Sequence, residues 1–178
     1  VNTRITNLKC SNKKLRHNVA QHLLRHAVIG KKITTVTRRA KYLLFIIDPD
    51  IVLVVHLGMT GKLGFSSPAA PADKHDHLFL TLDSGMEMRF NDVRRFGSIH
   101  LLNQKIPAQL ETSFFANTGP EPFNRQCSGS YLKKRAEKSR QPVKSFIMNN
   151  SIIAGVGNIY ANESLFAANI HPLTPAGS

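Results

Sequence analysis

The segment NDVRRFG, residues 91–97, places two arginines and a phenylalanine between two segments that are expected to be strands. Connections between strands lie at the surface of a protein, and binding residues concentrate there. Arg94 and Phe96 are therefore candidate binding residues. The question they raise is which partner accepts an apolar ring flanked by cations.

The charge balance narrows the class of partner. Lysine and arginine number 24 and aspartate and glutamate number 11, which gives a net charge of +13 and an isoelectric point near 10.2. This excess favours a polyanion, with nucleic acid as the first candidate. The alternative is a soluble protein that is merely basic. We expect no membrane partner, because the sequence has no basic amphipathic helix with a strong apolar face and no apolar run of membrane-spanning length.

Two further segments carry candidate contacts to nucleic acid. In RRAKYLL, residues 38–44, Arg39 and Lys41 are predicted to share one face of a strand, because successive side chains alternate. They form either a pair of cations directed at a phosphate track or a solvated strand face. In HLGMTG, residues 56–61, Met59 follows a buried strand. Such a methionine is either core filler or, where exposed, a wedge between bases.

Histidine and cysteine do not form a convincing metal site in this sequence. The tetrapeptide KHDH holds His75 and His77 around an aspartate, but no partner ligands are evident. A hydrogen-bonding or phosphate-contacting histidine is therefore favoured over a metal ligand. Cys10 and Cys127 lack metal-ligand spacing, so we expect free thiols of a cytosolic protein.

A glycine-containing turn separates two expected helices near the end of the chain. In AGVGNIYANESLF, Gly155 and Gly157 precede Asn158, and Lys144 lies one helix earlier. Glycine lets the backbone approach a partner, and amides at a helix start favour anions. The turn is therefore either a phosphate-binding element or a plain helical hairpin in which Asn158 is the N-cap.

The elements that position these residues fall into two modules. Alternating and β-branched segments predict strands, and their number favours a sandwich or barrel. A helix over 19–30, ending at Gly30, interrupts them. We expect a strand-rich module over 1–104, a linker over 105–124 and a helical module over 125–178. The expected strands are 5–9, 32–47, 51–58, 77–82, 86–90 and 96–103, and the later helices are 128–141, 142–152 and 159–170.

Seven segments together resemble one family, the bacterial formamidopyrimidine-DNA glycosylases, which excise oxidised purines. They occur in family order: RRAKYLL, HLGMTGKL, KHDHLFL, DVRRFGSIHLL, GPEPF, PVKSFIMNN and GVGNIYANESLFAANIHP. The resemblance implies an α+β fold, with an antiparallel β-sandwich followed by an incomplete helix–two-turns–helix domain. Two departures are Val93, where the family usually has proline, and MNN in place of an Asp-Gln ending.

The resemblance gives the candidate residues specific roles in base-excision repair. The family flips a damaged base out of the duplex, and three side chains fill the hole. The matching positions are Met59, Arg94 and Phe96. Lys41 matches a lysine implicated in phosphate contact and in proton donation during β-elimination, and the family nicks the abasic site by β,δ-elimination. The positions implied to contact DNA are His56, His75, Arg94, Arg140, Lys144 and Asn158, with Arg140 the loosest match.

The resemblance also implies segments that have no match here. The opening VNTRITNLK is similar to the first strand of the family, so the N-terminal helix with its nucleophilic proline and catalytic glutamate is not matched. The C-terminal zinc finger is not matched either, so we expect no cofactor in this chain. We interpret the chain as a fragment that does not cleave DNA efficiently and still binds it weakly, because Schiff-base chemistry needs a suitable amine.

Three alternatives accompany this interpretation. One is a non-catalytic remnant that binds damaged DNA. A second is the endonuclease VIII branch, which prefers oxidised pyrimidines, although DVRRFG resembles the purine branch. A third, an RNA- or ribosome-binding protein, is disfavoured by the same motifs. The expected partner is duplex DNA with an oxidised base or abasic site, bound by a monomer in a bacterial cytoplasm, at the nucleoid.

Overall fold

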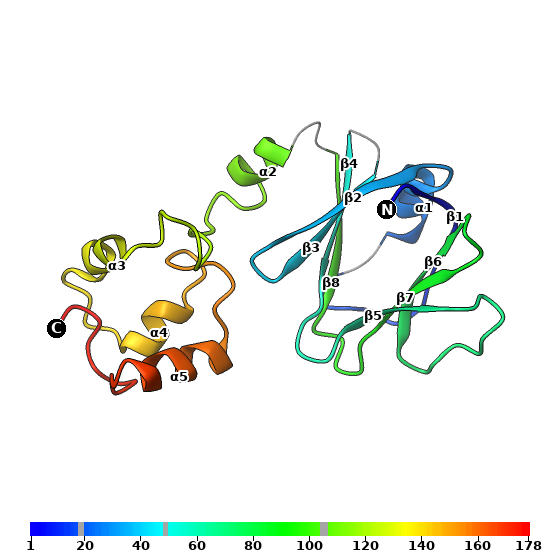
Figure 1. Cartoon of the computed structure of the whole chain (residues 1–178). Coiled ribbons are helices and arrows are strands. Elements are labelled where there is room, and N and C mark those ends of the chain that lie inside the picture. Colours follow the sequence, from blue (N-terminus) through cyan, green and yellow to red (C-terminus); the bar gives the residue numbers. More distant parts are fainter. Residues whose placement is uncertain (18–19, 48–49, 104–106) are drawn as a thin grey trace. The chain divides into compact units, whose positions relative to one another are not determined.

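The computed structural model describes residues 1–17, 20–47, 50–103 and 107–178. They divide into two units: Val1–Arg38 with Tyr42–Gln109, and Arg39–Lys41 with Leu110–Ser178. Figure 1 shows strands in the first, coloured blue to green, and helices in the second, coloured yellow to red. The expected α+β class, a strand-rich region followed by a helical one, is confirmed. The predicted boundary at 104–105 lies outside the described residues.

The first unit, called the strand unit below, contains an eight-stranded sheet in the order β5-β7-β6-β1-β2-β3-β4-β8. β1 pairs with β2 through Thr3 and Arg4, and with β6 from Ile5 onward. The sheet therefore folds over at β1 into two layers, as a sandwich requires. The strands are β1 Thr3–Cys10, β2 Lys32–Arg39, β3 Tyr42–Ile47, β4 Ile51–His56, β5 Lys62–Ser66, β6 Asp76–Leu82, β7 Glu87–Asn91 and β8 Ser98–Asn103.

One apolar core joins the two layers. Ile5, Leu53, Leu80 and Phe90, which come from different strands, are completely buried in it. Helix α1, Gln21–Val28, adds Val28 and packs against β1. The alternation of apolar residues along the strands thus produces one shared interior, and the strand ends and connections are left for binding.

Two strand predictions differ from the structure. The expected strand over 32–47 is a hairpin of β2 and β3, with Ala40 at φ 52° in its turn. The residues before and after Ala40 are β-branched or apolar and favour strands. No glycine, proline or asparagine marks the turn between them. Strand β5 was not expected. It is an edge strand with an interior glycine and an exposed Phe65, so its apolar alternation is weak.

The helices are α2 Pro107–Thr112, α3 Gly129–Ala136, α4 Val143–Met148 and α5 Asn158–Ala167, besides α1. Helix α2 lies within the segment 105–124 that was expected to be a linker. Helix α3 begins after Ser128, whose hydroxyl accepts the Tyr131 N–H at 3.2 Å. It ends earlier than predicted, and Lys138 beyond it has φ 65°. No helix in the described residues is long and apolar enough to cross a membrane.

The second unit, called the helical unit below, has its own small core. Ala136, Phe146, Ile152 and Ile153 are buried together. The Tyr131 hydroxyl donates to the Ile152 carbonyl at 3.0 Å, which joins α3 to the segment between α4 and α5. Helices α4 and α5 are therefore held at a defined turn, the one that carries Gly155 and Gly157.

Candidate nucleic-acid interface

Two connections of the strand unit lie in direct contact, and they are called the paired loops below: residues 57–61 after β4 and residues 92–97 before β8. A Cβ added to Gly58 would lie 2.6 Å from the Gly97 nitrogen, so only glycine permits this approach. Met59 is 70% exposed and Phe96 is 46% exposed. The Arg94 guanidinium lies over the Phe96 ring, 4.7 Å from its centroid. The three expected void-filling side chains thus share one site.

Buried polar groups lie beneath these exposed side chains. Asp92 is completely buried, and its carboxylate accepts the Thr60 hydroxyl at 2.5 Å and the Gly97 N–H at 2.7 Å. The Thr60 hydroxyl in turn accepts the Arg94 N–H at 3.2 Å. Sequence reasoning missed both Asp92 and Thr60. The only signal was an aspartate beside two arginines, and it did not identify a partner distant in the sequence.

His56 stands at the base of the loop 57–61. Its Nδ1 accepts the Gly58 N–H at 3.0 Å, and its ring centroid lies 4.9 Å from that of Tyr42. The expected DNA-contacting histidine therefore has a structural role in the turn.

His56 also acts on a second histidine, His100 of β8. Burial, the larger cause, lowers the pKa of His100, and the charges of His17 and His56 lower it further.

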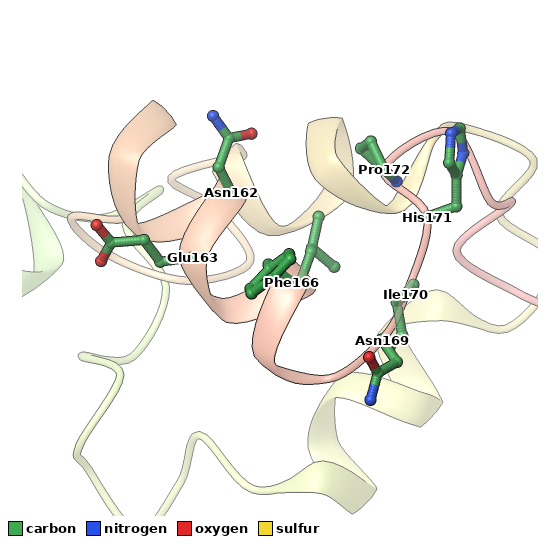
Figure 2. Close-up of a pocket in the computed structure, with 8 residues that line it drawn as sticks. Asn162, Glu163, Phe166, Asn169, Ile170, His171 and Pro172 are labelled. Atoms are coloured by element: carbon green, nitrogen blue, oxygen red, sulfur yellow. The ribbon is translucent and has the colours of Figure 1, made fainter.

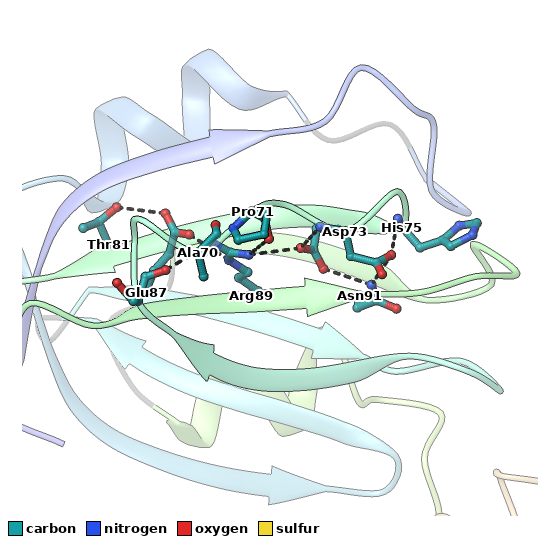
Figure 3. Close-up of polar contacts among 10 residues, drawn as sticks. Ala70, Pro71, Asp73, His75, Thr81, Glu87, Arg89 and Asn91 are labelled. Carbon is teal, nitrogen blue, oxygen red and sulfur yellow. Dashed lines mark hydrogen bonds and ion pairs between the residues drawn. The ribbon is translucent and has the colours of Figure 1, made fainter.

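His75 belongs to a loop that one arginine anchors to the sheet (Figure 3). Arg89, only 8% exposed, lies 2.9 Å from a Glu87 oxygen and 3.6 Å from an Asp76 oxygen, measured from its Nε and Nη1. It also donates to the carbonyls of Ala70 and Pro71 at 2.7 and 2.8 Å. Sequence reasoning missed Arg89, because strand alternation directs it away from the core and the covering loop is not visible in the pattern.

In the helical unit the hairpin tip Arg39–Lys41 has fixed partners. The Arg39 side chain pairs with Glu111 at 2.8 Å and Glu121 at 3.1 Å. The Glu121 carboxylate also accepts the Ala40 N–H at 2.6 Å. The prediction that Arg39 and Lys41 share a strand face is wrong, because the turn falls between them and Arg39 is held by carboxylates. Lys41 is exposed at this tip.

The tip lies beside the turn between α4 and α5. A Cβ on Gly155 would be 3.4 Å from Ala40, and one on Gly157 would be 3.8 Å from the Lys41 Nζ. The structure therefore brings Lys41 next to the start of α5, where Asn158 is exposed. Asn158 is the first helical residue and Gly157 is the N-cap, so the alternative of an Asn158 N-cap is wrong. The amides at this helix start face no side-chain cap.

The remaining expected contacts of this unit lie on or near α3 and α4. Lys144 is half-buried at the start of α4, and Arg140 is exposed between the two helices. Several other lysines and arginines of the helical unit are exposed like Arg140, so this unit has a positively charged surface. The exposed ones are Arg125, Lys133, Lys134, Arg135, Lys138 and Arg140.

An apolar pocket lies along the second half of α5 (Figure 2). The Phe166 side chain is exposed at this pocket, and Ile170 and Pro172 follow on the segment after the helix. Of the described residues that line it, none is an expected DNA contact. The lining residues are Asn162, Glu163, Leu165, Phe166, Asn169, Ile170, His171 and Pro172.

The family zinc implied by the resemblance does not fit the donor groups among the described residues. Burial raises the pKa of the Cys10 thiol to about 11, although the charge of Arg25 opposes this. Burial also raises the pKa of Cys127, which lies in the other unit. The described residues contain no group of three or more histidine, cysteine or acidic side chains that could hold a metal ion. No chemical step is therefore assigned to zinc here.

Comparisons with known proteins agree with this geometry. The family model for the formamidopyrimidine-DNA glycosylase N-terminal domain matches residues 1–99, and that for the H2TH domain of the same enzyme matches residues 118–178. The formamidopyrimidine-DNA glycosylase of Hahella chejuensis is 47% identical over 151 residues, which are 85% of this chain and 54% of that protein.

Two solved structures of the Lactococcus lactis enzyme are also similar. One is bound to DNA containing an AP site, with a TM-score of 0.90, 30% identity and coverage of 99% of this chain and 66% of that one. The other is bound to FAPY-dG containing DNA, with a TM-score of 0.91, 30% identity and coverage of 100% and 66%. The chain spans about half to two thirds of the length of these proteins. On these matches, the chain belongs to the formamidopyrimidine-DNA glycosylase family.

Proposed function

We propose that this chain recognises duplex DNA with an oxidised base or an abasic site, as the damage-reading part of a base-excision glycosylase for oxidised purines. The observation that carries the proposal is the set of exposed side chains on the paired loops. Met59 and Phe96 present apolar groups, and Arg94 presents a cation beside them. The relatives are bacterial, so the partner would be bacterial chromosomal DNA.

The chemistry of base flipping explains why these three side-chain types belong together. Unstacking a base step costs a few kcal/mol, and inserted apolar side chains offset this cost. Phe96 and Met59 are suited to wedge between bases, while the Arg94 donors are suited to the hydrogen-bonding edge of the orphaned base. The Arg94–Phe96 stack orders both groups before DNA arrives, which lowers the entropy cost of binding.

In the same proposal the helical unit holds the DNA backbone. The exposed start of α5 at Asn158, the nearby Lys41 and the cations around Arg140 and Lys144 are suited to phosphate oxygens. His56 and His75 are proposed backbone contacts of the strand unit. Lys41 is further proposed as the proton donor in β,δ-elimination, the lyase step of the parent enzyme.

Binding is tested by fluorescence anisotropy on two duplexes, one with a tetrahydrofuran abasic analogue and one intact. We expect tighter binding to the abasic duplex, and we expect Phe96→Ala to reduce that preference by about 5- to 30-fold, the effect of one or two kcal/mol. Phe65→Ala is the matched control, because Phe65 is the same type of side chain, 63% exposed on β5, and is not a residue of the paired loops. Equal binding of both duplexes by the unaltered chain would refute the proposal.

Catalysis is tested separately by borohydride trapping on a duplex with one oxidised guanine. The 178-residue chain is compared with the same chain extended by the N-terminal segment of a relative, which supplies the proline nucleophile. We expect cross-linking of the extended chain only. Cross-linking of the 178 residues alone would show that another amine serves, and it would contradict the proposal that they are inactive.

The non-catalytic alternative and the pyrimidine-lesion alternative give different results in these assays. A remnant that only binds damaged DNA shows the abasic preference but no cross-link even when extended. A pyrimidine-specific enzyme cross-links an oxidised thymine duplex faster than an oxidised guanine duplex. We expect the oxidised guanine duplex to react faster, because DVRRFG resembles the purine branch.

A further inference from the structure

We propose that Thr60 and Asp92 are positioning residues that couple the paired loops, so that Met59, Arg94 and Phe96 are presented to DNA as one unit. The role in DNA binding rests on the proposed function. The geometry rests on hydrogen bonds within the chain itself. The void-filling side chains come from two connections that are distant in the sequence, and Thr60 and Asp92 are separated by 32 positions. Apolar contact alone does not fix the relative orientation of two such loops.

The Thr60 hydroxyl is the link between the loops. A hydroxyl has one hydrogen to donate and two lone pairs. Here the hydrogen goes to Asp92 Oδ1 at 2.5 Å, and a lone pair accepts the Arg94 N–H at 3.2 Å. One side chain of the first loop therefore bonds to two residues of the second. Displacing either loop breaks both bonds together.

The Asp92 carboxylate is the fixed point of the second loop. Its Oδ2 accepts the Gly97 N–H at 2.7 Å, at the far end of the segment that carries Phe96, and its Oδ1 accepts the Thr60 hydroxyl of the first loop. The Asp92 N–H donates to the His75 carbonyl at 3.0 Å. The Asp92 main chain is thereby held where β6 begins, next to the Arg89-anchored loop.

His77 completes the anchor from inside the sheet. Its Nε2 lies 2.9 Å from the Asp92 carbonyl oxygen, and its Nδ1 lies 3.0 Å from the Ser11 hydroxyl. A carbonyl oxygen only accepts, so Nε2 carries the hydrogen, and in the neutral ring Nδ1 accepts from Ser11. Thr60, Gly97, His75 and His77 therefore all bond to Asp92, and this buried network lies beneath the loops that carry Met59, Arg94 and Phe96.

Substitutions at Thr60 separate the hydroxyl from the rest of the side chain. Thr60→Val keeps the shape and removes the hydroxyl, which leaves Asp92 Oδ1 and the Arg94 N–H without this partner. Thr60→Ser keeps the hydroxyl and removes a methyl group. If the pair positions the loops, Ser behaves like the wild type and Val does not.

The first test needs no DNA and measures amide hydrogen exchange by mass spectrometry on the full chain. We expect Thr60→Val to raise exchange in residues 57–61 and 92–97 together, by about 5- to 30-fold. Residues 67–75, which Arg89 anchors, are expected to stay unchanged and serve as the internal reference. Exchange raised in 57–61 alone, or equally in all three segments, would overturn the coupling.

The second test measures the ratio of affinities for the abasic and intact duplexes. A variant that is only less stable binds both duplexes less in proportion, so the ratio stays the same. We expect Thr60→Val to lower the ratio and Thr60→Ser to keep it at the wild-type value. In a protein that already carries Phe96→Ala, Thr60→Val is expected to lower the ratio little further. An unchanged ratio in Thr60→Val would overturn the positioning role while leaving the proposed function intact. No preference in the wild type would instead refute the proposed function, and the exchange result would still decide the coupling.

Discussion

The paired loops of the strand unit and the α4–α5 turn of the helical unit position their exposed groups by different means. Beneath the paired loops lie buried polar side chains, chiefly Asp92, with Arg89 beneath the neighbouring loop. The α4–α5 turn depends on its backbone, with Gly155 at φ 76° and Gly157 as N-cap, above a small apolar core. One region thus orients side chains, and the other presents backbone amides and exposed cations.

The difference corresponds to two kinds of contact with DNA. A side chain that enters the base stack has to hold one orientation, and orientation requires directional bonds beneath it. A phosphate contact carries no sequence information and tolerates several geometries, so amides at a helix start and long cationic chains suffice. We therefore expect substitutions of buried polar groups to affect the strand unit most, and glycine substitutions to affect the two turns unequally.

The largest effect is expected for Arg89→Ala. It removes the cation that pairs with buried Asp76 and with Glu87, and it removes the donor to the carbonyls of Ala70 and Pro71. Breaking a buried ion pair from one side costs about 3–5 kcal/mol, and urea denaturation followed by circular dichroism measures it. The control is Lys62→Ala, an exposed cation of β5. An equal, small loss in both variants would mean that buried polar groups do not anchor this region.

A pair of glycine substitutions sharpens the comparison between the two turns. Gly58→Ala forces a Cβ to within 2.6 Å of the Gly97 nitrogen and 2.7 Å of the Phe96 carbonyl carbon, at φ 65°. We expect a loss of about 1–3 kcal/mol from backbone strain. Gly157→Ala meets only the Lys41 Nζ at 3.8 Å, and we expect a loss within about 1 kcal/mol, the range of cap substitutions. Thermal denaturation ranks the two, and the reverse ranking would contradict the comparison.

The elements that sequence patterns predicted are those with a strong local signal. Strand β4 is a continuous apolar run, and the β6–β7 hairpin has alternating residues around a glycine turn, so both were predicted. The turn at Ala40 was missed because it has a positive φ without a residue type that favours one. Residue type and position in the chain made Met59, Arg94 and Phe96 candidate contacts, and the family resemblance gave them their shared void-filling role.

The supporting residues of the site could not be predicted in the same way. Asp92 and Thr60 are distant in the sequence, and only the folded sheet places their side chains together. Strand alternation assigns Arg89 to the outer face, where the loop over residues 67–75 covers it. Buried polar networks depend on tertiary contacts between segments, so a periodic pattern in one segment carries no signal for them.

A smaller effect is expected where the Glu121 carboxylate of the helical unit holds the hairpin tip that carries Lys41. Glu121→Ala removes the acceptor of the Ala40 N–H and a partner of Arg39, beside Lys41. We expect a loss of about 1–2 kcal/mol. Glu121→Gln keeps an acceptor oxygen, so it is expected to lose less. Hydrogen exchange of residues 39–41 measures the effect, and equal exchange in Ala and Gln variants would show that the hydrogen bond to Ala40 contributes nothing.

The smallest effect is a pH dependence that originates at His100 of β8, in the strand unit. Burial, followed by the charges of His17 and His56, lowers the pKa of His100 below its ordinary value of 6.5. The unfolded chain therefore takes up a proton near pH 6.5 that the folded chain does not, so stability is complete above that pH and declines as the pH falls below it. His100→Gln removes this proton uptake. Urea denaturation of both proteins from pH 8 to about pH 5 should show the wild type losing its advantage over the variant only below pH 6.5. A constant difference across that range would show that His100 is not held neutral by its surroundings.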